Sequence, residues 1–170
     1  FQNVSYNEKG CVAFDLVEKG NVTDHIQLSV TGDHNVSNAL AAIATAKLLN
    51  ISMSVIEKGL LSFSGTDRRF EYKGTLDGIT IVDDYAHHPT ELRATLNTAK
   101  ELGYKRVIAV HQPFTYSRTK MLMDEFAKVL RAADQVVLLP IMGGREKDDG
   151  SVKSEDLAAK LPGSVVVSGL

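Results

Sequence analysis

The chain has 170 residues, 44% hydrophobic and 24% charged, proportions that are ordinary for a globular protein of one or two domains. A formal net charge of −2 argues against a surface for nucleic acid or anionic lipid, and no apolar run nears the ~20 residues of a membrane span. The chain opens without a signal peptide and has one cysteine, Cys11, so we expect a cytoplasmic protein without an internal disulfide or a cysteine zinc site.

Residues 1–31 show the alternation of apolar and polar side chains that is typical of antiparallel strands. The two clearest runs are 11–17 and 24–30, with a turn before each. In the second run the isoleucine, leucine and valine share one face. His25 therefore falls on the opposite face, where we expect a solvent-exposed residue without a function.

A turn at 32–35 leads into an alanine-rich helix predicted over 36–49. His34 and Asn35 stand at its start, and Asn38 follows one turn later. Asparagine is an ordinary helix cap, so a purely structural role is one interpretation. The other is that these amides bind the donor and acceptor edges of adenine, as amide side chains do in nucleic acids.

A second helix is predicted over 53–61, and Arg68 and Arg69 follow it in a charged segment. This segment is either a solvated turn or a place where an arginine faces a crevice and binds a triphosphate. Both interpretations stay open on the residues alone.

From residue 71 onward strands and helices alternate. A hairpin over 71–82, with an Asp-Gly turn, comes first. A helix over 89–102 follows, in which Pro89 suits the first position and Glu91 completes a capping box. The remaining predicted elements are strands at 106–110, 136–139 and 165–167, one helix over 119–132, and a short helix capped by Ser154.

This order predicts an α/β fold in which the part from about residue 74 onward is a Rossmann-like, mostly parallel, doubly wound sheet, preceded by a part with antiparallel strands. The loops 83–89, 111–118 and 140–150 follow strands, so we expect them to line one crevice. The glycine-rich charged loop 143–150 is expected to be mobile. The chain stops at a strand, which indicates a piece of a longer protein.

The densest group of titratable side chains is Asp84-Tyr85-Ala86-His87-His88. A helix start needs no pair of histidines, so a purely structural role is the weaker interpretation. A carboxylate here can accept hydrogen bonds from a ribose, and imidazoles can bind a carboxylate or phosphate, or move a proton near neutral pH. No third ligand is evident for a zinc ion, and we predict no metal site.

Arg118 lies in a polar segment, 112–120, after a buried strand. The segment is either a helix start capped by Ser117 or an anion clamp, in which the guanidinium and the helix N-terminus bind a carboxylate. Neither Gly-x-x-x-x-Gly-Lys-Ser/Thr nor Gly-x-Gly-x-x-Gly occurs in the chain. The sequence thus holds two sets of ligand-binding candidates and no visible phosphate-binding loop.

Four motifs in this order resemble the Mur ligases. The first is general to the family, the last two are typical of its alanine-adding members, and weaker similarity continues to the loop 145–147. The motifs are Gly32-x-His34-Asn35-x-x-Asn38-Ala39-Leu40-Ala41-Ala42, Phe63-x-Gly65-x-x-Arg68-Arg69-Phe70-Glu71, Asp83-Asp84-Tyr85-Ala86-His87-His88-Pro89-Thr90-Glu91 and Gln112-Pro113-x-x-Tyr116-Ser117-Arg118-Thr119.

The resemblance implies the C-terminal part of a three-domain enzyme. Residues 1–73 would be the end of a central α/β ATPase domain, and residues 74–170 a C-terminal Rossmann-like domain, truncated at its end. In the family's reaction ATP phosphorylates the carboxylate of UDP-N-acetylmuramic acid. The amine of L-alanine then attacks the acyl phosphate, the amide forms, and phosphate leaves. Mg²⁺ ions, held mainly by the missing part, would screen the phosphoryl charge. This reaction belongs to peptidoglycan precursor synthesis in the bacterial cytoplasm, and the fragment alone is expected to be inactive.

The resemblance also assigns the candidate residues to two ligands. For the nucleotide, His34, Asn35 and Asn38 would lie by the adenine, Arg69 by the ribose or phosphates, and Asp84 on the ribose hydroxyls. For catalysis, Tyr85, His87, His88 and Arg118 would face the incoming alanine and the acyl phosphate.

The chain departs from the family pattern at Phe114-Thr115, where the family often has His-Arg. More of the carboxylate binding would then fall on Arg118. Two alternatives stay open. One is a Mur-type ligase with a different amino-acid or peptide specificity, and the other is a non-catalytic nucleotide-binding α/β protein of which this chain is the whole.

Overall fold

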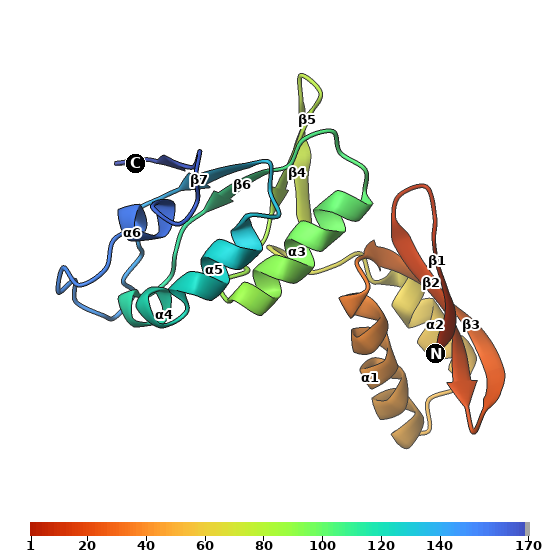
Figure 1. Cartoon of the computed structure of the whole chain (residues 1–170). Helices are drawn as coiled ribbons and strands as arrows, with labels where there is room; N and C mark the ends of the chain where they lie inside the picture. Colours follow the sequence, from red (N-terminus) through yellow and green to blue (C-terminus); the bar gives the residue numbers. More distant parts are fainter. Residues whose placement is uncertain (169–170) are drawn as a thin grey trace. The chain divides into compact units, whose positions relative to one another are not determined.

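The structure is a computed structural model that describes residues 1–168. The chain divides into two compact units, which meet in sequence between Asp84 and Tyr85 and are described separately below (Figure 1). Within the described range, no helix has both the length and the apolar character needed to cross a lipid bilayer.

The first unit contains an antiparallel sheet packed against two helices (Figure 1). The strands pair in the order β1-β2-β3, and His25 on β3 is exposed, with its Nδ1 atom 2.8 Å from Asp15 Oδ1. The antiparallel strands, the two helices and the exposure of His25 confirm the predictions. The elements are β1 (Gln2–Tyr6), β2 (Cys11–Glu18), β3 (Asn21–Thr31), α1 (His34–Leu48) and α2 (Met53–Ser62).

A second, two-stranded sheet completes this unit. Strands β4 (Glu71–Leu76) and β5 (Ile79–Asp83) form the predicted antiparallel hairpin. Asp77 and Gly78 both have positive φ angles, 49° and 79°, as the tight turn of a two-residue hairpin requires. The alternation of elements predicts β5 as the first strand of the parallel sheet. The structure differs, because β5 pairs with β4 and not with β6, β7 or β8.

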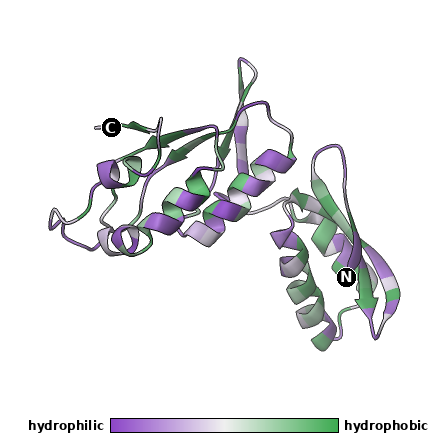
Figure 2. Cartoon of the chain, in the orientation of Figure 1, coloured by the Kyte–Doolittle hydropathy of each residue, from purple (hydrophilic) through white to green (hydrophobic). Residues whose placement is uncertain are grey.

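The second unit alternates helices with a parallel sheet of three strands in the order β6-β7-β8. Helices α3 and α5 pack side by side, each with a hydrophobic and a hydrophilic side (Figure 2). Their apolar residues and those of β7 form one core, which confirms the α/β class and the parallel sheet. The elements are α3 (Pro89–Glu101), β6 (Ile108–His111), α4 (Tyr116–Met121), α5 (Met123–Leu130), β7 (Gln135–Leu138), α6 (Ser154–Ala158) and β8 (Val165–Val166).

Two local predictions are wrong. The helix expected over 119–132 is two helices, because Leu122 leaves the helical region with φ −107° and ψ 19°. Ser154 does not cap α6 but is its first helical residue, since its hydroxyl donates to the Leu139 carbonyl at 2.7 Å and ties the helix to the end of β7. The predicted domain ranges 1–73 and 74–170 stay a prediction, since the compact units reflect contacts alone.

Candidate functional site

The loops that follow β6 and β7 lie side by side at the carboxyl ends of these strands. The Thr115 N–H donates to the Met142 carbonyl at 2.9 Å, and the Met142 N–H donates to the Pro113 carbonyl at 2.9 Å. Phe114 and Met142 form a parallel bridge. The loops 111–118 and 140–150 therefore meet at one edge of the sheet, where open α/β sheets bind ligands.

Phe114 contacts two of the predicted catalytic residues of this unit, His87 and Arg118. The His87 ring lies edge-on to two aromatic rings, with centroid distances of 5.2 Å to Tyr85 and 6.1 Å to Phe114. The guanidinium carbon of Arg118 lies 5.9 Å from the Phe114 centroid, within cation–π range. We call Tyr85, His87, Phe114 and Arg118 the Phe114 group. The sequence identifies Phe114 only as the loss of a basic side chain, and nothing in it indicates this contact role.

The His87 ring is held in one tautomer. Its Nδ1 atom is 2.9 Å from the Tyr85 carbonyl and 3.5 Å from Glu91 Oε2, and both oxygens only accept hydrogen bonds. The proton of the neutral ring therefore sits on Nδ1. The Nε2 atom is left with a lone pair, so it can accept a proton or a hydrogen bond from a ligand.

His88 has the opposite arrangement. Its Nδ1 atom accepts a hydrogen bond from the Thr90 N–H at 3.3 Å, so the neutral ring carries its proton on Nε2. Glu91 accepts from the His88 N–H at 3.2 Å, which confirms the predicted capping box with Pro89 in the first turn. The two neighbouring histidines thus offer one acceptor and one donor, and His88 is also the N-cap of α3.

The capping role of His88 predicts a stability effect that is separable from any chemistry. His88→Asn keeps a good N-cap acceptor, so the unfolding free energy should stay within about 0.5 kcal/mol of wild type, whereas His88→Leu should lose about 1 kcal/mol. Urea unfolding of the three proteins measures both values. Equal stability of the leucine and asparagine variants would show that the cap contributes nothing.

Arg118 is carried by α4, a helix whose first N–H groups already have partners. The Thr115 hydroxyl accepts from the Arg118 N–H at 3.4 Å, and the Glu146 carboxylate accepts from the Ser117 N–H at 2.9 Å. The interpretation of Ser117 as the cap is therefore wrong, because Thr115 is the cap. An anion can be clamped here by the guanidinium but not by the Ser117 N–H. The Arg118 Nη1 atom is buried and has no hydrogen-bond partner among residues 1–168.

His111, the last residue of β6, is a buried titratable group that the sequence does not single out. It is 5% exposed, and its ring stacks at a tilt on Phe126 with the centroids 5.5 Å apart. Burial lowers the pKa of His111 to about 4, so the ring is neutral at physiological pH. Its Nε2 atom has no hydrogen-bond partner in the described part of the chain.

In the first unit, the predicted adenine-binding residues gather in the first turn of α1. His34 and Asn38 are exposed, and the Asn38 amide donates to Asn35 Oδ1 at 3.0 Å. The Asn35 amide donates to the Thr31 carbonyl at 2.8 Å, so it also fixes the start of the helix. A structural and a binding role are thus compatible for Asn35, because the hydrogen bond to the Thr31 carbonyl also orients the linked side chains of Asn35 and Asn38.

The hairpin brings Asp84 to the segment that holds Arg69, although 15 positions separate them in sequence. The Phe70 N–H donates to Asp84 Oδ2 at 2.8 Å, and Arg68 Nε lies 3.5 Å from Asp83 Oδ2. Arg68 and Phe70 have positive φ angles of 57° and 47°, which mark a tightly turned backbone. The backbone next to Arg69 is therefore bound to Asp84, while the binding of ribose or phosphates by these two residues stays a prediction.

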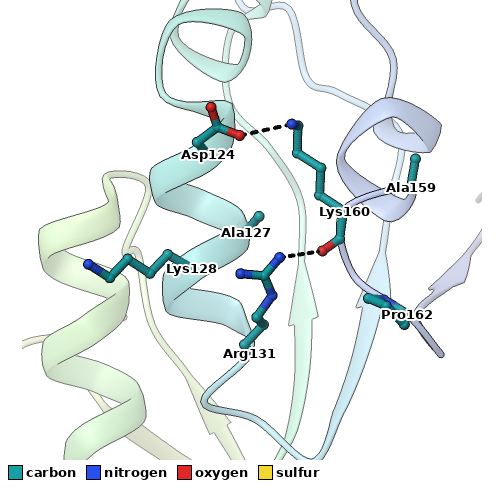
Figure 3. A pocket seen from close by; sticks show the side chains of 7 residues that line it. All are labelled: Asp124, Ala127, Lys128, Arg131, Ala159, Lys160 and Pro162. Atoms are coloured by element: carbon teal, nitrogen blue, oxygen red, sulfur yellow. Dashed lines mark hydrogen bonds and ion pairs between the residues drawn. The ribbon is translucent and has the colours of Figure 1, made fainter.

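An open groove between α5 and the segment around α6 is lined by none of these residues (Figure 3). Two of its basic side chains bind other groove residues: Lys160 pairs with Asp124 at 2.8 Å, and Arg131 donates to the Lys160 carbonyl at 2.9 Å. Among all of residues 1–168, no three His, Cys, Asp or Glu side chains are grouped to hold a metal ion. The prediction of no metal site stays a prediction.

Comparison with known proteins gives a consistent result. Residues 68–168 match the family described as Mur ligase, glutamate ligase domain. The chain is 47% identical over 156 residues to a UDP-N-acetylmuramate–L-alanine ligase of Caldanaerobacter subterraneus, and 46% identical over 160 residues to that of Clostridium beijerinckii. These alignments cover 92% and 94% of this chain but only 34% and 35% of the relatives, so the chain spans about a third of their length.

A solved structure agrees with these relatives. The UDP-N-acetylmuramate–alanine ligase of Thermotoga maritima superposes with a TM-score of 0.75 at 30% identity, over 94% of this chain and 35% of that one. Both compact units thus have counterparts in a single solved enzyme.

Proposed function

Since the chain belongs to the Mur ligase family, we propose that the whole protein is the ATP-dependent ligase that joins L-alanine to UDP-N-acetylmuramic acid through an acyl phosphate. The observation that carries the proposal is the Phe114 group, in which the His87 imidazole and a guanidinium whose buried Nη1 atom has no hydrogen-bond partner among residues 1–168 lie against one ring. The setting is peptidoglycan precursor synthesis in the bacterial cytoplasm.

The second unit would bind the amino acid. The Arg118 guanidinium has a buried, unpaired Nη1 atom, and a carboxylate would supply the missing acceptors in a bidentate pair. The ammonium group of the same amino acid must lose a proton before its nitrogen attacks the carbonyl carbon of the acyl phosphate. The Nε2 atom of His87 carries the lone pair that can accept this proton, while Tyr85 packs against the same imidazole. The Nε2–H of His88 would donate to the acyl phosphate.

The first unit would bind part of the ATP. We assign the adenine to His34, Asn35 and Asn38. The side-chain amides of the two asparagines are hydrogen-bonded to each other at the start of α1. Asp84 would accept hydrogen bonds from the ribose hydroxyls, with Arg69 beside the ribose or phosphates. Asp84 is suited to this role because the hairpin and the Phe70 N–H hold its carboxylate in place.

Mg²⁺ would be held mainly by the part of the enzyme outside this chain. Among residues 1–168, no three His, Cys, Asp or Glu side chains are grouped to hold a metal ion, and Mg²⁺ is commonly bound by one or two carboxylates together with water and substrate phosphates. We therefore assign the metal ligands to the rest of the enzyme and derive no step through the ion.

The proposal is tested by amino-acid-dependent phosphate release in the full-length protein. With ATP and UDP-N-acetylmuramic acid, L-alanine should stimulate release more strongly than glycine, L-serine or a dipeptide. A stronger response to another amino acid or to a peptide would indicate a Mur-type ligase of different specificity. No response to any of them would indicate a nucleotide-binding protein without ligase activity.

The 170-residue chain alone is expected to form no product, because it contains no phosphate-binding loop to place the ATP phosphates. Incubation with all three substrates, followed by chromatography of the UDP-linked product, measures this against the full-length enzyme at equal concentration. Measurable product from the isolated chain would refute the assignment of the missing catalytic parts to the rest of the protein.

A further inference from the structure

We propose that Glu146 is a positioning residue that orients Arg118 by holding Ser117. The inference rests on the proposed function, in which Arg118 binds the carboxylate of the incoming amino acid. It assigns a role to the loop 143–150, which the sequence predicts as a mobile polar loop.

The Glu146 carboxylate makes two hydrogen bonds to one residue. It accepts from the Ser117 N–H at 2.9 Å and from the Ser117 hydroxyl at 2.5 Å. These bonds, the hydroxyl first, hold the pKa of Glu146 below its ordinary value, so that the group is a carboxylate at neutral pH. Two bonds to a charged acceptor fix both the backbone and the side chain of the residue next to Arg118.

The turn that carries Glu146 also packs against the residue before Ser117. The Glu146 N–H donates to the Gly143 carbonyl at 3.0 Å, which closes the turn. A Cβ atom on Gly143 would stand 2.6 Å from Cε2 of Tyr116 and 2.9 Å from the Glu146 carbonyl oxygen. Only glycine therefore allows the Tyr116 ring to lie this close, so the loop contacts both residues that precede Arg118.

The helix α4 needs this outside support. It has six residues, too few to be stable by its own hydrogen bonds. Its cap, Thr115, has a φ of 65°, an unfavourable value for a β-branched residue that persists only when the surroundings impose it. On either side of this angle, the Thr115 N–H donates to the Met142 carbonyl and the Ser117 N–H donates to the Glu146 carboxylate, so the loop after β7 holds the backbone here. The direction in which Arg118 leaves the helix is thus set by the loop after β7.

Kinetics of the full-length enzyme with Glu146→Gln test this role. The amide keeps the shape but loses the charge and one of the two acceptor oxygens. We expect the KM for L-alanine to rise at least tenfold while the KM for ATP stays within twofold. The matched control is Glu155→Gln, the same change at an exposed carboxylate in the first turn of α6, which should leave both values unchanged.

A double-mutant cycle identifies the route through Ser117. Ser117→Ala removes the hydroxyl bond and keeps the N–H bond, so we expect a smaller rise in the KM for L-alanine, about threefold. The double variant, with Glu146→Gln and Ser117→Ala, should raise this KM by less than the product of the two single effects. Ser117→Ala also tests the proposal if Glu146→Gln fails to fold. An unchanged alanine KM in a folded variant, equal rises for alanine and ATP, or multiplicative effects would each overturn the proposal. Wild-type enzyme without alanine-dependent phosphate release would instead contradict the proposed function.

Discussion

Arg118→Ala in the full-length enzyme should lower kcat/KM for L-alanine about 100-fold, equivalent to ~2.7 kcal/mol, while the KM for ATP changes little. The reason is the unpaired, buried Nη1 atom, which a substrate carboxylate would complete with a charge-assisted bond. The unpartnered Nη1 atom also predicts the direction of the stability change. Arg118→Ala removes a buried polar atom that has no hydrogen-bond partner, so the melting temperature should stay unchanged or rise.

Two variants separate the guanidinium from simple positive charge. Arg118→Lys keeps the charge but not the planar fork, so it should recover only part of the loss. Lys120→Ala removes an exposed cation from the same helix and should leave the alanine kinetics as in wild type. Steady-state phosphate release with varied alanine and saturating ATP gives the three values. An unchanged alanine response in Arg118→Ala would exclude this residue from the amino-acid site.

His111→Phe should stabilise the protein by about 1–3 kcal/mol at pH 7, because it removes a buried polar atom that lacks a partner. The new ring would take the place of the imidazole against Phe126. Since phenylalanine is larger than histidine, His111→Leu serves as a second variant that does not overfill the core. Urea unfolding monitored by circular dichroism measures the three free energies.

The same position should govern stability between pH 7 and pH 5. Burial lowers the pKa of His111 to about 4 in the folded protein, against 6.5 for an exposed histidine. The unfolded chain therefore binds a proton as the pH falls below 6.5 while the folded chain does not, so acid favours unfolding. Wild type should lose about 2 kcal/mol relative to either variant between pH 7 and pH 5.

Carboxylates whose pKa is lower in the folded protein contribute little to the change in stability between pH 7 and pH 5. The pKa values of Asp124 and Glu146 are lowered in the folded protein, by Lys160 and Ser117 respectively. Their stabilisation is present above the unfolded values, 3.8 and 4.5, and is lost as the pH falls below them. Between pH 7 and pH 5 it is therefore nearly constant. Parallel pH profiles for wild type and both variants would show that His111 is not the titrating group.

The elements that the sequence predicts well are those with short-range causes. The capping box of α3 follows from Pro89 and Glu91, and the hairpin turn follows from Asp77-Gly78, since each is fixed by residues within four positions. The grouping of strand-end loops also follows from chain order, because parallel strands place their carboxyl ends at one edge. This reasoning holds for the loops after β6 and β7, which meet in the structure, but not for Tyr85, because β5 pairs with β4 outside the parallel sheet. The roles of Tyr85 and Arg118 in a site stay a prediction.

The features that the sequence does not predict depend on distant partners. The break at Leu122 has no proline or glycine nearby, so the apolar periodicity continues across it. Ser154 resembles a cap until the Leu139 carbonyl takes its hydroxyl. The contact of Phe114 with His87 and Arg118 joins residues that are 27 and 4 positions away, and no local pattern marks it.

The order in which the protein folds follows from the partners of α4. The bonds that complete this helix come from Met142 and Glu146, which lie beyond β7, some 27 to 29 positions after Thr115 and Ser117. They can form only after β7 has aligned beside β6 and the intervening α5 has docked, because chain closure over such a span is unfavourable until other contacts offset it. A nascent chain that ends before β7 has the Arg118 sequence but lacks the residues that accept from Thr115 and Ser117, so we expect the proposed amino-acid site to form only after the loop that follows β7 has been made.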